Sequence, residues 1–190
     1  MPSPIVPARH ARSTILLGSI ASVRAAGRYD EYAARLAATD RELLVGAVAG
    51  SWIPIDVAFS HYQACDALGF PVDQQVANGR ATFDKTRGTL LGTLVRMAKA
   101  GGMTPWSVFP RCQRYWERGY DGGGVRVTKV GPKEARLDLV AFRLADSPYF
   151  RNALRGLVTG LTELFSTKAY VTERPGAHVA GSTSLRLQWA

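Results

Sequence analysis

The chain has 190 residues, about the length of one ordinary domain or of two very small ones. Hydrophobic residues make up 46% and charged residues 21% of it, a globular composition that excludes a disordered or fibrous protein. Two cysteines are too few for a disulfide scaffold, and no apolar run reaches the ~18 residues needed to span a membrane.

The formal net charge of +9 is concentrated in the second half of the chain. Residues 1–95 hold 9 basic and 8 acidic groups, whereas residues 96–190 hold 15 and 7. We expect a basic surface that binds an acidic protein or a lipid, although interleaved acidic residues also fit an ordinary solvated face. Nucleic acid is not expected, because no helix-turn-helix, zinc-finger or aromatic RNA-binding signature is present. The residues of this predicted basic surface are Arg111, Arg114, Arg118, Arg126, Lys129, Lys133 and Arg136.

Prolines at positions 2, 4 and 7 predict a flexible N-terminal arm over residues 1–13, followed by a single domain over residues 14–190. The apolar stretch at 15–20 is short and follows the prolines, which is unlike a secretory signal peptide. We therefore expect a cytoplasmic protein with reduced cysteines and no transmembrane segment.

Apolar residues then recur first at helical spacing and later at strand spacing. The helical stretches lie at residues 15–23, 29–36, 43–48, 55–68 and 84–100. Alternation over 125–142 predicts a β-hairpin, and Asp146-Ser-Pro148 predicts the start of a helix that reaches about Phe165. Two further strands, at 169–172 and 185–189, form a second hairpin. The predicted fold class is α+β: N-terminal helices, then an antiparallel sheet of two hairpins separated by a helix.

Two pairs of glycines stand one helical turn apart, Gly88 with Gly92 and Gly156 with Gly160. Such pairs allow another backbone to approach closely, and an apolar cleft between helices and a sheet is a common ligand site. The alternative is that the apolar residues around them are simply core. The pocket residues that we predict are Leu91, Val95, Trp106, Phe109, Tyr149, Phe150, Leu154 and Leu157.

No catalytic motif is present, so we expect a protein that is not an enzyme. His61 and Cys65 are four residues apart on a predicted helix and therefore share a face, which makes them the alternative ligands for a metal or a haem. No third ligand is near them in sequence, and a free cysteine is usually a small buried hydrophobe. The expectation is accordingly no metal and no cofactor.

A resemblance to known proteins depends on the last third of the chain. The helix reads Ser147-Pro-Tyr-Phe-Arg-Asn-Ala-Leu-Arg-Gly156-Leu-Val-Thr-Gly160-Leu-Thr-Glu-Leu-Phe165 and leads into the two closing strands. This run is similar to the haem nitric-oxide/oxygen-binding domains. It is also similar to their haem-free relatives, the 4-vinyl-reductase-type domains and transport-protein-particle subunits. The resemblance implies an α+β fold with a helical layer over a sheet and a pocket for haem, lipid or another apolar ligand.

A second resemblance covers residues 15–189. The chain resembles a myxobacterial-type paralogous family of about 200-residue proteins of unknown function. The motifs that match are Gly27-Arg-Tyr-Asp-x-Tyr32, Trp52-Ile-Pro54, His61-Tyr-x-Ala-x-Asp-Ala-Leu-Gly69, Gly92 and Trp116-x-Arg-Gly-Tyr120.

Two departures from the haem-binding members bear on the ligand. Those members carry a Tyr-x-Ser-x-Arg triad for the haem propionates, whereas the corresponding stretch here is Phe142-Arg-Leu-Ala-Asp-Ser-Pro-Tyr149. They also carry a proximal histidine before the sheet, and residues 84–124 contain none. We therefore predict a non-catalytic sensor or interaction module that binds an apolar small molecule or an unknown protein partner. The alternatives are a haem or metal sensor and an adaptor with a basic surface; a homodimer is compatible with all of them.

Overall fold

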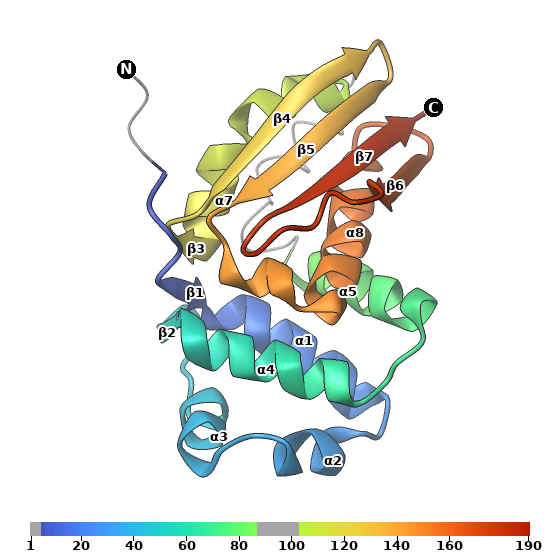
Figure 1. Cartoon of the computed structure of the whole chain (residues 1–190). Coiled ribbons are helices and arrows are strands. Elements are labelled where there is room, and N and C mark those ends of the chain that lie inside the picture. Colours follow the sequence, from blue (N-terminus) through green and yellow to red (C-terminus); the bar gives the residue numbers. More distant parts are fainter. Residues whose placement is uncertain (1–4, 87–102) are drawn as a thin grey trace.

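The computed structural model describes residues 5–86 and 103–190, and it has the predicted α+β architecture (Figure 1). A layer of N-terminal helices lies below a twisted antiparallel sheet, and two more helices lie against the sheet itself. The predicted helix at 84–100, with Gly88, Leu91, Gly92 and Val95, lies outside the described residues apart from its first turn.

The N-terminal layer contains α1 (Ser13–Ala25), α2 (Tyr29–Ala34), α3 (Ala38–Val45), α4 (Ile55–Ala67) and α5 (Val72–Thr86). Apolar residues at helical spacing bury one face of α1 and of α4, as the sequence predicts. The predicted helical stretch at 43–48 is wrong in its bounds and its buried face, because α3 ends at Val45 and buries only Leu44, while Leu43 and Val48 are exposed. Gly69 follows α4 with a φ of +65°, the left-handed conformation in which glycine ends helices. Pro71 then precedes α5, a 15-residue helix whose residues 72–83 lie outside every helical stretch predicted from the sequence.

The C-terminal half carries the sheet. Short 3₁₀ turns at Pro105–Ser107 and Phe109–Arg111 lead into α7 (Cys112–Gly119), and another at Arg143–Asp146 leads into α8 (Pro148–Thr162). The strands β4 (Gly124–Gly131), β5 (Glu134–Val140), β6 (Ala169–Glu173) and β7 (Thr183–Trp189) pair in the order β4-β5-β7-β6. The Ser147 hydroxyl accepts a hydrogen bond from the Phe150 amide, so the predicted helix start at Ser147-Pro148 is confirmed.

The start of the chain differs from the predicted flexible arm. Strand β1 (His10–Arg12) lies between β2 (Trp52–Pro54) and β3 (Tyr120–Asp121) in a small second sheet. The Ala8 amide donates to the Ala141 carbonyl, and Ala11 is fully buried. The three prolines all precede these paired residues, so they do not interrupt the ladder. The expectation of an arm over residues 1–13 is therefore wrong for residues 8–12.

The helix pair α5 and α8 forms the tightest contact in the fold. A Cβ atom on Gly156 would lie 1.9 Å from the Val76 carbonyl oxygen, and one on Gly79 would lie 1.9 Å from the Ala153 carbonyl oxygen. Gly160 faces the Phe83 ring in the same way, at 2.5 Å. The prediction of close backbone approach is confirmed at Gly156, whereas Gly160 meets side chains; α5 is the helix that both contact.

Candidate functional site

An apolar cavity of about 150 Å³ lies between the helices and the inner face of the sheet; we call it the central cavity. Its walls come from α1, α5, α7, α8 and strands β3 to β5, so distant parts of the chain meet there. The described residues that line it are Ile15, Thr82, Phe83, Cys112, Tyr115, Trp116, Gly119, Tyr120, Val125, Leu137, Leu139, Leu154, Leu157, Val158 and Leu161.

The period of each element explains why these side chains converge. On β5, Leu137 and Leu139 alternate with polar residues and point to the covered face of the sheet. On α8, Leu154, Leu157, Val158 and Leu161 recur at spacings of three and four and so share a face. The glycines of α8 turn toward α5 instead. One helix therefore presents a leucine-rich face to the cavity and a glycine face to its neighbour.

No residue described around the central cavity is basic or acidic. Burial raises the pKa of the Cys112 thiol to about 12, so this group is a protonated thiol at neutral pH. Burial likewise raises the pKa of the Tyr120 hydroxyl above its ordinary value. The described lining therefore offers apolar surface with a few neutral polar groups and no charged side chain.

A second, very small cavity of about 30 Å³ adjoins it and shares Leu154 and Leu157 in its wall. Its lining adds the polar side chains of Ser19, Asn78 and Tyr149. The Asn78 side-chain amide donates to the Tyr149 hydroxyl at 3.0 Å, and Tyr149 is fully buried. The larger apolar cavity thus has a polar neighbour whose groups are already hydrogen-bonded to each other.

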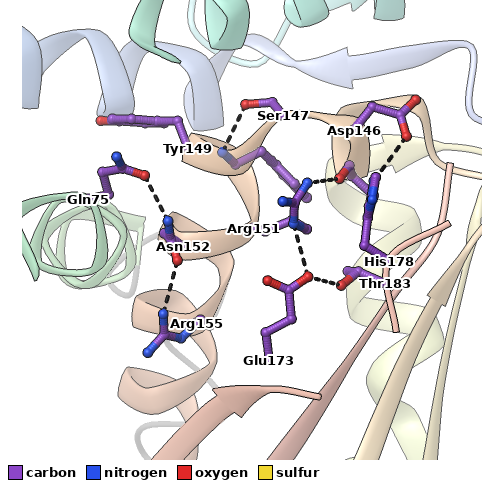
Figure 2. A network of polar contacts seen from close by, with 12 residues as sticks. Gln75, Asp146, Ser147, Tyr149, Arg151, Asn152, Arg155, Glu173, His178 and Thr183 are labelled. Carbon is purple, nitrogen blue, oxygen red and sulfur yellow. Dashed lines mark hydrogen bonds and ion pairs between the residues drawn. The ribbon is translucent and has the colours of Figure 1, made fainter. Parts of the chain in front are cut away.

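The polar side of α8 holds the cavity wall in place, as Figure 2 shows. Arg151 contacts the Glu173 carboxylate on β6 at 2.9 Å, and Glu173 also accepts a hydrogen bond from the Thr183 hydroxyl. The adjacent residue faces the other way: the Asn152 side-chain amide donates to the Gln75 side chain of α5 at 2.9 Å. These contacts tie α8 to the sheet on one side and to α5 on the other, so its apolar face is fixed.

The structure brings together only part of the predicted pocket. Leu154 and Leu157 line the central cavity, and Tyr149 and Phe150 line its small polar neighbour. Trp106 and Phe109 pack instead around Trp189, with ring centroids 5.1 and 5.5 Å from it. The pocket predicted from the sequence contains no residue of α7, although Cys112, Tyr115 and Trp116 line the central cavity.

His61 and Cys65 share a face of α4, as their spacing predicts, and both are fully buried. The His61 ring contacts the Tyr32 hydroxyl through Nδ1 at 2.7 Å and the Ser19 hydroxyl through Nε2 at 3.0 Å. Burial lowers the pKa of His61 to about 3, so its ring is neutral. Within the described residues, no group of three or more potential ligands is placed to hold a metal ion.

The predicted basic surface divides into three parts. Arg111, Arg114 and Arg118 are exposed along α7. Arg126 lies on the outer face of the sheet, where Arg136 forms an ion pair with Asp138 at 2.9 Å. Lys129 and Lys133 flank the turn between β4 and β5.

Comparison with solved structures gives the class of fold. The chain is similar to the Fe(II) unliganded H-NOX protein from K. algicida, with a TM-score of 0.70 and 9% identity over 94% of this chain and 96% of that one. It is also similar to an oxygen-binding H-NOX domain related to soluble guanylate cyclases, with a TM-score of 0.59 and 12% identity over 94% of each chain. The protein therefore has the α+β fold of the haem nitric-oxide/oxygen-binding domains.

No family model and no curated protein matches the sequence. None of the helices in the described part of the chain has the length and apolar character to cross a bilayer.

Proposed function

We propose that this protein is a non-catalytic sensor or interaction module that binds a small apolar molecule in the central cavity. The observation that carries the proposal is the lining between helices and sheet, whose described residues are uncharged and rich in leucine and aromatic side chains. An apolar cavity of about 150 Å³ stays dry and takes up guests such as benzene. The ligand class is therefore a small aromatic or short-chain apolar molecule.

Solved structures of similar fold include haem proteins, so haem is the natural alternative. The residues that the structure describes do not form a haem site. All three histidines lie elsewhere: His10 pairs with Asp121, His61 is in the helical layer, and His178 contacts Asp146 on the surface. The Cys112 thiol is protonated, no described cavity residue is cationic toward propionates, and a large ligand needs about 300 Å³ or more.

Within this proposal the protein is cytoplasmic, and it signals through the contacts that surround the cavity. The helical layer and the sheet meet at the cavity, so a guest there contacts both and favours the arrangement that fits it best. We also propose that the protein is related to the 4-vinyl-reductase-type domains and to the myxobacterial-type family of about 200-residue proteins that its sequence resembles.

The test combines native mass spectrometry with the absorption spectrum of freshly purified protein, followed by thermal unfolding with and without benzene as the probe. We expect no Soret band, and we expect benzene to raise the unfolding temperature because it binds only the folded state. Val158→Phe, which fills the cavity, removes the shift, whereas Val72→Phe at an exposed position retains it. A Soret band with a retained haem mass, or no effect of benzene, contradicts the proposal.

A further inference from the structure

Three of the four lysines in the described residues gather at one end of the four-stranded sheet. The strand register places them: the Trp189 amide donates to the Lys133 carbonyl, and the Ala190 amide donates to the Lys168 carbonyl. Lys129 lies opposite Ala135, two residues along the strand from Lys133. The three residues therefore surround this end of the sheet: Lys129 is on the covered face, with Ala135, and Lys168 is on the outer face, with Tyr170. We call Lys129, Lys133 and Lys168 the lysine rim.

The lysine rim carries uncompensated positive charge. All three lysines are exposed, and no carboxylate among the described residues forms an ion pair with them. Two acidic side chains close in sequence to Lys133 and Lys168 are held by arginines: Glu134 accepts two hydrogen bonds from Arg186, and Glu163 pairs with Arg80. The sequence of residues 87–102 contains no Asp or Glu. The charge at this end is therefore available to an external anion.

Apolar and aromatic side chains lie next to these lysines. Val130, next to the β4–β5 turn, is 59% exposed, and Tyr170 on β6 is 53% exposed. The Lys168 ammonium lies 5.1 Å from the centre of the Tyr170 ring, and the Lys129 ammonium lies 5.4 Å from Trp106. Long lysine stems keep their charge in water while apolar neighbours are buried, and tyrosine and tryptophan favour the headgroup level of a bilayer.

We propose that the lysine rim docks this protein onto an anionic lipid surface. The ammonium groups contact headgroup phosphates, while Val130 and the Tyr170 ring enter the headgroup layer. An acidic protein would also pair with the lysines, but it would not explain why a valine next to the hairpin turn is exposed. The site lies at the end of the sheet farthest from α3, and it is separate from the central cavity (Figure 1).

The experiment is co-sedimentation of the full chain with vesicles of phosphatidylcholine alone or mixed with phosphatidylserine. We expect binding only to the mixed vesicles, weakened by salt because the attraction is screened. Each Lys→Gln change in the rim lowers the affinity about fivefold, from about 1 kcal/mol per lysine near an anionic surface. Val130→Asp lowers it further by blocking insertion.

Two matched variants at the opposite end of the molecule serve as controls: Arg41→Gln for charge, and Val48→Asp for an exposed valine (76% exposed). Both retain vesicle binding if the rim is the site. Equal binding to neutral and anionic vesicles, no binding to either, or equal losses in the control variants overturns the proposal. Binding of soluble polyglutamate by the rim without vesicle binding also overturns it, and assigns the surface to an acidic protein.

Discussion

The two apolar faces of α8 show opposite packing. Toward α5, glycines let the two helices approach so closely that no side chain fits between them. A methyl group on Gly156 would overlap the Val76 carbonyl oxygen. Toward the sheet, the same helix presents Leu154, Leu157 and Val158, yet they leave a cavity of about 150 Å³. Protein interiors usually contain few voids of this size.

This difference separates the part of the core that sets the fold from the part that is open to a ligand. A close backbone contact tolerates no added atom, because two main chains cannot repack independently. A cavity lined by long flexible side chains tolerates added volume, because there is space for it. Substitutions on the two faces of α8 therefore have opposite expected outcomes.

The largest effect is expected from Gly156→Ala. Alanine favours an exposed helix by about 1 kcal/mol over glycine, but here its methyl group would overlap backbone, so we expect a net loss of about 3 kcal/mol or more. Gly160→Ala is milder, because its methyl group meets the Phe83 ring, which can shift. Thermal unfolding followed by circular dichroism measures both. An unchanged or higher unfolding temperature for Gly156→Ala would show that the α5–α8 contact is loose.

Acid provides the next test, because it acts on His61 in the helical layer, whereas the described residues of the central cavity carry no charge. The pKa of His61 falls from about 6.5 to about 3 on folding, so its stabilising contribution is complete above about pH 6.5 and is lost as the pH falls toward 3. The loss between pH 7 and pH 5 is about 2 kcal/mol from this group alone.

The measurement compares unfolding free energies of the wild type and of His61→Gln at both pH values. Asp66, whose pKa is raised chiefly by burial, opposes the trend in both proteins and cancels in the comparison. The variant is less stable at pH 7, since Tyr32 and Ser19 lose their partner, but its stability falls less with acid. Parallel pH profiles would mean that His61 is not buried as a neutral ring.

The sequence predicts the α+β order, the hairpin at 125–142, the Ser147 cap and the glycine contact of α8, because each depends on neighbours within one or two turns. It predicts the cavity only in part, since Leu154 and Leu157 belong to a visible helical stripe. The α7 contribution is missed because the stripe of Cys112, Tyr115 and Trp116 reads equally as core. The pairing of β1 is also missed, because a three-residue strand has no period to detect.

A smaller effect is expected on the polar side of α8. Glu173→Gln removes the carboxylate that faces Arg151, and both side chains are largely buried, at 27% and 16% exposure. We expect a loss of about 1 to 2 kcal/mol, discounted for the remaining solvent access. Glu134→Gln, which breaks a comparable arginine pair on the exposed face of the sheet, is the matched control and has a smaller effect. Equal effects would mean that the contact in Figure 2 does not anchor α8.

The smallest change in stability is expected from Val158→Phe, although this substitution adds more atoms to α8 than any other considered above. The added ring volume enters the central cavity, so new apolar contacts offset most of the repacking cost and the net change stays below about 1 kcal/mol. Equilibrium denaturation in urea measures it, with an unchanged m-value as the sign that the fold is retained. A loss comparable to that of Gly156→Ala would mean that both faces of α8 are equally close-packed and that the central cavity has no room for a ligand. A small loss joined to the disappearance of the benzene effect would instead establish that face as the ligand site, because only occupancy of the cavity has changed.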